Sequence, residues 1–415
     1  MTSEAALEDE AAAARELLTA AAVRTRSAAV FARIADGASE HFTYAPQALA
    51  GIADRVASLT RERHFDLAVP LHSRFRHFEA GGIDRVGSLA AARGWTTPEA
   101  AARGLADLAV VSVLLDAGAG PRWRYTEAAT GTEAVRSEGL ALASLSMFAG
   151  GAFSAVPADP LRVDAAALAT LGADELAAGF QVSADNPLEG VEGRLGLLAA
   201  LADAVRSAPD LFTQEDDPRP GGIIDALAAD AENGTVQAEA ILEAVLEGLG
   251  PIWPSRLTLA GVPLGDAWPY PPIGDGRAPG SDVVPFHKLS LWLSLSLVEP
   301  LGVRGIAVAG LDALPGLAEY RNGGLFVDGG ALVQRHEAPP LDVGHPMIVE
   351  WRAATVTLLD RLAPLVREGL GVSADDLPLA AILEGGTWAA GRRLAAERRA
   401  DASPPIAIVS DGTVF

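Results

Sequence analysis

Cysteine is absent from this chain of 415 residues. Disulfides, thiolate nucleophiles and cysteine-ligated zinc sites are therefore excluded. Basic residues are also few, because 32 Lys and Arg stand against 54 Asp and Glu, which gives a net charge of −22. Sequence-independent binding of nucleic acid needs Lys and Arg to neutralise phosphates, so this balance argues against a nucleic-acid partner. A local basic pocket for one small phosphate is still compatible with it.

Long apolar runs are missing as well. The longest, Leu108 to Leu115, is far too short to span a bilayer. Residues 1–15 are acidic and rich in Ala, and they lack the basic start and apolar run of a signal peptide. We therefore expect a soluble, cytoplasmic protein with no membrane partner, and the lack of Cys is compatible with a reducing compartment.

The composition is that of a globular protein, with 49% hydrophobic and 21% charged residues. The length favours more than one compact unit. Residues 213–222 form a charged and then Pro/Gly-rich stretch, so we expect a linker there, between an N-terminal lobe of about 1–212 and a C-terminal lobe of about 223–415. Residues 269–282 form a second stretch rich in Pro and Gly.

Helical spacing of apolar residues dominates the chain, so a mainly α fold with few short strands is predicted. Leu289 to Leu297 alternates Leu with Ser as a strand would, yet it has no β-branched residue and follows Pro285, which favours a helix. The best strand signals are residues 348–351 and 406–410. Helices are predicted over residues 9–35, 46–62, 97–115, 137–148, 164–171, 189–207, 235–249 and 387–400, with one more that Ser373 opens.

The stretch Gly316–Gly324 is the best candidate for a functional site. It places Glu319, Tyr320 and Arg321 side by side between apolar flanks and follows them with two glycines. A charge pair between apolar segments costs free energy unless it is paired or in use. A polar-substrate site needs a fixed carboxylate, a fixed cation and a close-approaching backbone. The alternative is a buried Glu–Arg pair that fixes the turn.

Other polar residues stand in apolar or glycine-rich surroundings. His72 and His77 lie among Arg74 and Arg76, which suits a substrate pocket, a solvated turn or, less well, a metal site. Lys288 opens an apolar segment, where it would reach water, a carboxylate or a ligand anion. The stretches rich in Gly match neither a P-loop nor a dinucleotide-binding fingerprint, and the His residues show no ligand spacing, so neither a cofactor nor a metal is expected.

Asp116 and Trp388 are two further candidates for a functional site. Asp116 ends the apolar run Leu108 to Leu115 and is followed by aromatic residues, as in a pocket for a planar polar group, or it is a simple turn residue. Trp388 stands out among the tryptophans because its context is polar and glycine-rich.

These stretches resemble the uracil-catabolism family, a domain of unknown function found in fungi and bacteria. The family is associated with a route that opens uracil at the nucleotide level and ends in urea and a three-carbon acid. The resemblance covers nearly the whole chain, as one family domain over residues 1–415. It is carried by Leu114–Gly120, Ser137–Gly139, Gln181–Leu188, Gly250–Pro254, Pro285–Lys288, Ala318–Gly324, Glu350–Arg352 and Glu384–Arg392.

The order of these motifs is also similar to that of the queuosine salvage proteins, which hydrolyse the N-glycosidic bond of queuosine 5′-phosphate. Phe286–Lys288 matches a Phe-Tyr-Lys stretch there, and Ala318–Arg321 matches an Ala-Asp-Tyr-Arg stretch that carries the essential carboxylate. Val349–Arg352 matches a Val-Glu-x-Arg stretch. This likeness implies a two-lobed helical fold akin to helix-hairpin-helix DNA glycosylases. Because Glu319 is one methylene longer than Asp, queuine specificity is not implied.

The resemblance thus implies an N-ribosyl hydrolase that acts on a uracil-derived nucleotide or nucleoside, such as ribosylurea 5′-phosphate. The alternatives are an amidohydrolase on the ring-opened intermediate and a non-catalytic ligand-binding protein, and a homo-oligomer is left open. Glu319 would stabilise charge on the sugar and Asp116 would recognise the leaving group in the same cleft. The predicted substrate-binding residues are Lys288, Arg321, Tyr320, His72, Trp388 and Arg392.

Overall fold

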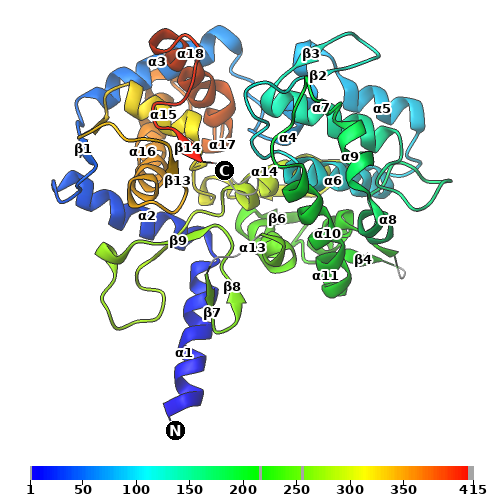
Figure 1. The fold of residues 1–415 in the computed structure, drawn as a ribbon, viewed down its shortest axis with the longest axis horizontal. Helices are drawn as coiled ribbons and strands as arrows, with labels where there is room; N and C mark the ends of the chain where they lie inside the picture. Colours follow the sequence, from blue (N-terminus) through cyan, green and yellow to red (C-terminus); the bar gives the residue numbers. More distant parts are fainter. Residues whose placement is uncertain (1, 215–216, 254–256, 410–415) are drawn as a thin grey trace. The chain divides into compact units, whose positions relative to one another are not determined.

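The computed structural model of the chain describes residues 2–214, 217–253 and 257–409 (Figure 1). Helices carry most of these residues, and every sheet among them pairs only two short strands, which confirms the predicted mainly α fold. The described chain divides into two compact units. The first takes in residues 2–72, 257–291 and 310–409, and the second takes in residues 73–214, 217–253 and 292–309.

The units interleave along the chain, so they divide it at other places than the predicted linker. The described part of residues 213–222 belongs to the second unit, and residues 215–216 lie outside the described residues. None of the described helices combines the length and the apolar character that a bilayer-spanning segment needs.

The first unit combines three stretches of chain that are far apart in sequence. Its helices are α1 (Thr2–Leu17), α2 (Ala20–Ala35), α3 (Ala48–Arg63), the first residues 288–291 of α14 (Lys288–Val303), α15 (Tyr320–Asp328), α16 (Pro346–Leu370), α17 (Leu379–Ile382), the π-helical turn Leu383–Thr387 and α18 (Trp388–Arg398). Its paired strands are β1 (Phe42–Tyr44) with β12 (Leu332–Gln334), β7 (Thr258–Leu259) with β8 (Val262–Pro263), β9 (Ala267–Pro269) with β10 (Val283–Pro285), and β13 (Leu341–Asp342) with β14 (Ile408–Val409).

Helix α16 forms the centre of the first unit. Every side chain from Met347 to Leu359 is buried, because α2, α3 and α15 pack against this helix. The predicted strand over residues 348–351 is therefore wrong: the apolar run is continuous because the helix is covered on all sides. Pro346 at the first helical position and His345, whose Nδ1 accepts from the N–H of Met347 at 3.1 Å, start the helix.

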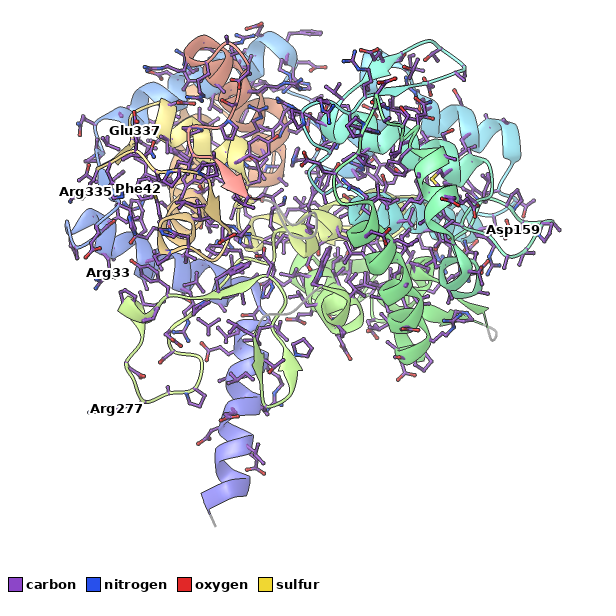
Figure 2. All side chains as sticks on the ribbon, viewed as in Figure 1. Arg33, Phe42, Asp159, Arg277, Arg335 and Glu337 are labelled. Atoms are coloured by element: carbon purple, nitrogen blue, oxygen red, sulfur yellow. The ribbon has the colours of Figure 1, made fainter. Side chains whose placement is uncertain are left out.

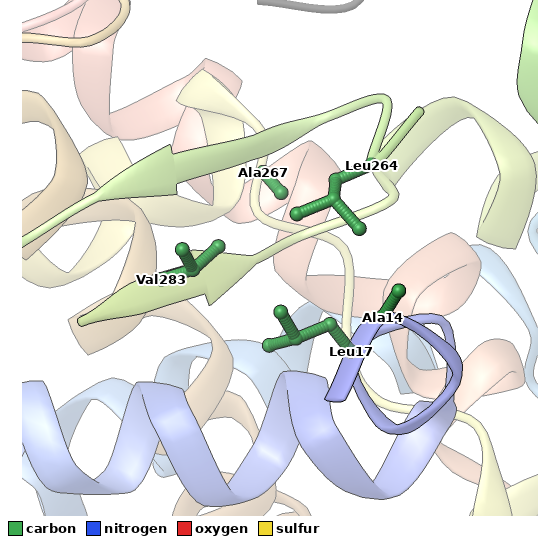
Figure 3. Close-up of a cluster of buried hydrophobic side chains, with 5 residues drawn as sticks. All are labelled: Ala14, Leu17, Leu264, Ala267 and Val283. Carbon is green, nitrogen blue, oxygen red and sulfur yellow. The ribbon is translucent and has the colours of Figure 1, made fainter. Parts of the chain in front are cut away.

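The predicted helix over residues 9–35 is two helices, because Thr19 begins a new one. Its hydroxyl accepts from the N–H of Ala22 at 3.1 Å and caps α2. At the end of α1, Ala14 and Leu17 pack against Leu264, Ala267 and Val283 of the β8–β10 region (Figure 3). This small cluster fixes the hairpin that leads into α14.

Two further predictions concern the C-terminal stretch of the first unit. Ser373 opens no helix: its hydroxyl and N–H bond to Asp376 in a local turn, and α17 begins only at Leu379. The predicted strand over residues 406–410 is confirmed at β14, and Ser410 lies outside the described residues.

A side-chain contact supports the β1–β12 pair. Arg335 Nε, next to β12, donates to the carbonyl oxygen of Phe42 in β1 at 3.2 Å (Figure 2).

The second unit is mainly helical, and α6 starts as predicted, with Thr97 as its cap and Pro98 at its first position. The segment 289–297 is helical too, within α14. The helices are α4 (Arg74–Phe78), α5 (Arg85–Arg93), α6 (Pro98–Leu114), α7 (Arg136–Ala149), α8 (Ala165–Thr170), α9 (Ala173–Gly179), α10 (Val191–Ser207), α11 (Pro209–Phe212), α12 (Ile223–Ala229), α13 (Ala238–Leu249) and residues 292–303 of α14. The paired strands are β2 (Tyr125–Thr126) with β3 (Glu133–Ala134), β4 (Thr213–Gln214) with β5 (Asp217–Pro218), and β6 (Thr235–Gln237) with β11 (Ala307–Ala309).

Candidate functional site

Glu319 lies immediately before α15 and caps it. Its backbone is extended, with φ −116° and ψ 160°, and its carboxylate accepts the N–H of Arg321 at 2.7 Å and the N–H of Asn322. Only 9% of the residue is exposed. A carboxylate at this position is stabilised by the first N–H groups of the helix and by the helix dipole. The fold therefore holds the carboxylate in one orientation.

The neighbours of Glu319 in sequence have structural partners of their own. Arg321 Nη1 donates to the carbonyl oxygen of Ala402 at 2.9 Å, and the guanidinium lies 4.8 Å from the ring centroid of Tyr320. These contacts give the Arg321 guanidinium partners other than the Glu319 carboxylate. A Cβ on Gly323 would come within 2.8 Å of Thr355 Oγ1. This glycine thus allows α15 to approach α16, rather than a substrate to approach the backbone.

Two opposing effects act on the charge of Glu319. Burial raises the pKa of its carboxyl group, whereas the N–H bonds from Arg321 and Asn322 and the charges of Lys288 and His72 lower it. Burial is the larger effect, so the pKa lies above its ordinary value. The charges of Lys288 and His72 favour the ionised form of this carboxylate. Glu319, Lys288 and His72 all belong to the first unit.

A buried ion pair sets the position of Lys288 at the start of α14. Asp266 accepts the Lys288 N–H at 3.1 Å and both terminal nitrogens of Arg352, at 2.8 and 2.7 Å. Burial alone would raise the pKa of Asp266, but Arg352, Trp268 and the Lys288 N–H lower it to about 2. The preceding residue, His287, has a positive φ of 45° and its Nε2 donates to the carbonyl oxygen of Leu17 at 2.9 Å. The backbone strain of this left-handed residue is thus held by the contact with α1 just before Lys288.

The stretch that matches Val-Glu-x-Arg lies on α16. Arg352 pairs with Asp266, and Glu350 accepts the hydroxyl of Tyr270 at 2.6 Å and that of Ser39. All these groups are buried. Through these contacts, α16 holds the segment from Asp266 to Tyr270, which precedes Lys288 in the chain.

His72 belongs to the same unit and is bound through its ring. Its Nδ1 lies 2.8 Å from Glu384 Oε2, and the residue is 5% exposed. The His72 ring centroid lies 6.4 Å from that of Trp388. The guanidinium of Arg392 lies over the Trp388 ring, 5.4 Å from its centroid. Half-buried Trp388 is thus a neighbour of His72, and exposed Arg392 is a neighbour of Trp388.

The turn that carries Glu384 is π-helical and packs tightly against α3. A Cβ on Gly386 would meet Val56 Cγ1 at 2.5 Å, so only glycine fits there. At the end of the turn, the hydroxyl of Thr387 donates to Asn322 Oδ1 at 2.9 Å. Single π-helical turns within α-helices occur frequently at functional sites.

Asp116 belongs to the second unit, where it is largely buried. Arg74 Nη1 donates to its Oδ1 at 2.7 Å, and the hydroxyl of Ser137 donates to its Oδ2 at 3.1 Å. Arg74 is fully buried, and its Nε donates to Ser112 Oγ at 2.7 Å. Arg194 holds the following loop by donating to the carbonyl oxygens of Leu115 and Ala117, and burial lowers its pKa to about 10. The structure therefore gives Asp116 a structural partner that the sequence did not indicate.

His72 and His77, which share one short stretch of sequence, belong to different units. His77 lies in the second unit, with its ring centroid 5.4 Å from that of Trp292. Across residues 2–214, 217–253 and 257–409, no group of three or more His, Asp or Glu is arranged to hold a metal ion.

Sequence reasoning missed three residues that shape these sites, namely Asp266, Glu384 and Arg74. Asp266 is a single carboxylate in the bend before β9, and its partner Arg352 is 86 positions away. Glu384 was seen only as part of a matching motif, and its partner His72 is 312 positions away. Arg74 was seen only as a neighbour of His72 and His77, and its partner Asp116 is 42 positions away.

Comparison with known proteins gives one consistent result over most of the chain. The model of a family described as a protein of unknown function, DUF1688, matches residues 16–415. The chain is 40% identical to the uracil catabolism protein 4 of Lachancea kluyveri, over 92% of this chain and 93% of the relative. It is 39% identical to the protein urg3 of Schizosaccharomyces pombe, over 96% of this chain and 98% of the relative.

Proposed function

Because this chain belongs to the DUF1688 family, and a relative that it matches over most of its length is named a uracil catabolism protein, we propose that it acts in uracil catabolism. We further propose that it is an N-ribosyl hydrolase for a uracil-derived nucleotide such as ribosylurea 5′-phosphate. The observation that carries this second step is the Glu319 carboxylate, which is buried, fixed by two N–H groups and within reach of the charges of Lys288 and His72.

This arrangement suits the cleavage of a ribosyl C–N bond. As the bond breaks, positive charge builds on the sugar, and a fixed carboxylate close to C1′ stabilises that charge. Lys288 and Arg321 are the cations that we assign to the anionic part of the substrate, such as a 5′-phosphate. Tyr320, Trp388 and Arg392 complete the proposed substrate-binding set.

Asp116 keeps a proposed role in recognising the leaving group. Its pairing with buried Arg74 supports a fixed carboxylate, which could orient a urea or amide N–H. The same pairing also supports a structural role in the second unit, and removing both members of the pair separates the two roles.

The experiment that tests the proposal supplies the purified protein with ribosylurea 5′-phosphate. Release of both urea and ribose 5-phosphate, the latter seen as a new reducing sugar, is the expected result. Release of ammonia or carbamate without a reducing sugar would instead identify an amidohydrolase. Binding without any turnover would identify a ligand-binding protein and overturn the enzymatic proposal.

A further inference from the structure

The carboxylate of Glu384 holds His72 by one particular ring nitrogen. Glu384 Oε2 lies 2.8 Å from His72 Nδ1, and Glu384 Oε1 lies 3.5 Å from Arg63 Nη2. A carboxylate only accepts hydrogen bonds, so Nδ1 must carry the hydrogen. The nitrogen of His72 that can take up or release a proton is therefore Nε2. Histidines that transfer protons in enzymes are commonly oriented in this way.

Both members of the pair are anchored through their backbones. The N–H of His72 donates to the carbonyl oxygen of Ala380 at 2.9 Å. Arg63 Nη1 donates to the carbonyl oxygens of Glu384 and Gly385, at 2.6 and 3.2 Å, and so satisfies acceptors of the π-helical turn. The geometry of the pair is thus set by several contacts in addition to its own hydrogen bond.

The pair is also connected to Glu319 through packed elements of the same unit. Thr387 ends the turn that carries Glu384, and it bonds to Asn322. The N–H of Asn322 in turn donates to the carboxylate of Glu319. A proton donor and a charge-stabilising carboxylate need fixed relative positions, and these contacts provide them.

We propose that His72 is the residue that protonates the leaving nitrogen, and that Glu384 is the positioning residue that orients its imidazole. The inference rests on the proposed N-ribosyl hydrolase function. As the C1′–N bond breaks, its electron pair stays on the nitrogen, which takes the proton from His72 Nε2. A water molecule then adds its oxygen to C1′ and returns a proton to His72. Water is the one co-reactant, and no oxidant is needed.

The test compares two substrates that differ in their need for protonation. Ribosylurea 5′-phosphate has a basic leaving group, whereas 4-nitrophenyl ribofuranoside 5-phosphate releases a phenolate that leaves without a proton. The variants are His72→Gln, Glu384→Gln and, as an exposed control, Glu62→Gln, which removes a carboxylate paired with Arg393 on the surface. Melting temperatures are measured on the same samples.

On ribosylurea 5′-phosphate, we expect kcat to fall by about 100- to 10,000-fold in His72→Gln, and by about 10- to 100-fold in Glu384→Gln. On the nitrophenyl substrate, both losses should shrink to less than about tenfold, and Glu62→Gln should match the wild type on both. Equal losses on the two substrates would overturn the proton-transfer role. A wild-type protein that cleaves neither substrate would overturn the proposed function, and this inference with it.

Discussion

The hydroxyl of Thr387 donates to the side-chain oxygen of Asn322 at 2.9 Å, and both residues are fully buried. This bond joins the π-helical turn that carries Glu384 to the helix that Glu319 caps. A further close approach supports the same junction, since a Cβ on Gly391 would come within 2.1 Å of the carbonyl oxygen of Arg321. Helices α15 and α18 thus pack with their backbones nearly in contact, and the site residues on them are held together.

Replacing Thr387 by Val should weaken the attachment of the π-helical turn to α15. The amide oxygen of Asn322 would lose its partner in a buried environment, so the free energy of unfolding should fall by about 1–3 kcal/mol. Thr387→Ser keeps the hydroxyl and should lose less. Thr25→Val, on the exposed face of α2, removes a comparable hydroxyl bond to a helix carbonyl and serves as the control. Equal melting temperatures for Thr387→Val and Thr25→Val would refute this role of the bond.

The variant Glu319→Gln should lose turnover while keeping the fold. Burial raises the pKa of Glu319, so folding makes ionisation of this carboxyl group less favourable than it is in the unfolded chain. That contribution to stability is present below the unfolded pKa and is lost as the pH rises through the folded pKa. A neutral Gln avoids this loss, so the melting temperature at pH 7 should not fall. Turnover should drop by roughly two to four orders of magnitude, about 3–5 kcal/mol in the barrier, with substrate binding largely kept.

Glu319→Asp is the matched variant for this measurement. It keeps the charge but shortens the arm, so its loss of turnover should be milder, although the carboxylate should still be misplaced. If Glu319→Gln melts at a lower temperature and its folded fraction keeps full specific activity, then Glu319 is a helix cap and not a catalytic group.

Asp116 can be tested by removing its ion pair in two steps. Asp116→Asn leaves Arg74 buried without a charged partner, so it should destabilise the fold by about 3–5 kcal/mol. The double variant Asp116→Leu with Arg74→Met replaces the pair by apolar groups and should recover much of that stability. If Asp116 recognises the leaving group, the recovered fold should remain inactive. Full turnover in the double variant would make Asp116 structural only.

The Asp266–Arg352 pair predicts a loss of stability in acid. The pKa of Asp266 is lowered to about 2 from an ordinary value of 3.8, so its contribution is present above about pH 4 and is lost as the pH falls toward 2. The shift corresponds to about 2 kcal/mol. Asp266→Asn should therefore be less stable than the wild type at pH 7, and the difference should narrow at pH 3. A difference that does not change with pH would exclude the ionised pair, and Asp54→Asn on the exposed face of α3 is the control.

Chelation should leave turnover unchanged. The chain has no cysteine and its histidines show no ligand spacing, so the proposed reaction uses side chains alone. The measurement is the release of ribose 5-phosphate before and after dialysis against EDTA. Loss of activity that one divalent ion restores would contradict the prediction and direct attention to His72 and Glu384 as ligands.

The sequence by itself determined the helices that carry strong local signals. Thr97, Pro98 and the acidic first turn mark the start of α6, because a helix end is satisfied by residues within one turn of it. The absence of β-branched residues likewise decided that 289–297 is a helix. Glu319 was found because a carboxylate between apolar flanks needs a partner or a use.

Tertiary structure alone decided the rest. Residues 348–351 are helical because helices on several sides bury them, so their apolar run imitates a buried strand. The partners of Glu319 turned out to be backbone N–H groups, and the pairs His72–Glu384 and Asp266–Arg352 join residues 312 and 86 positions apart. Local patterns report on a turn or two of chain, whereas these contacts exist only because packing brings distant segments together.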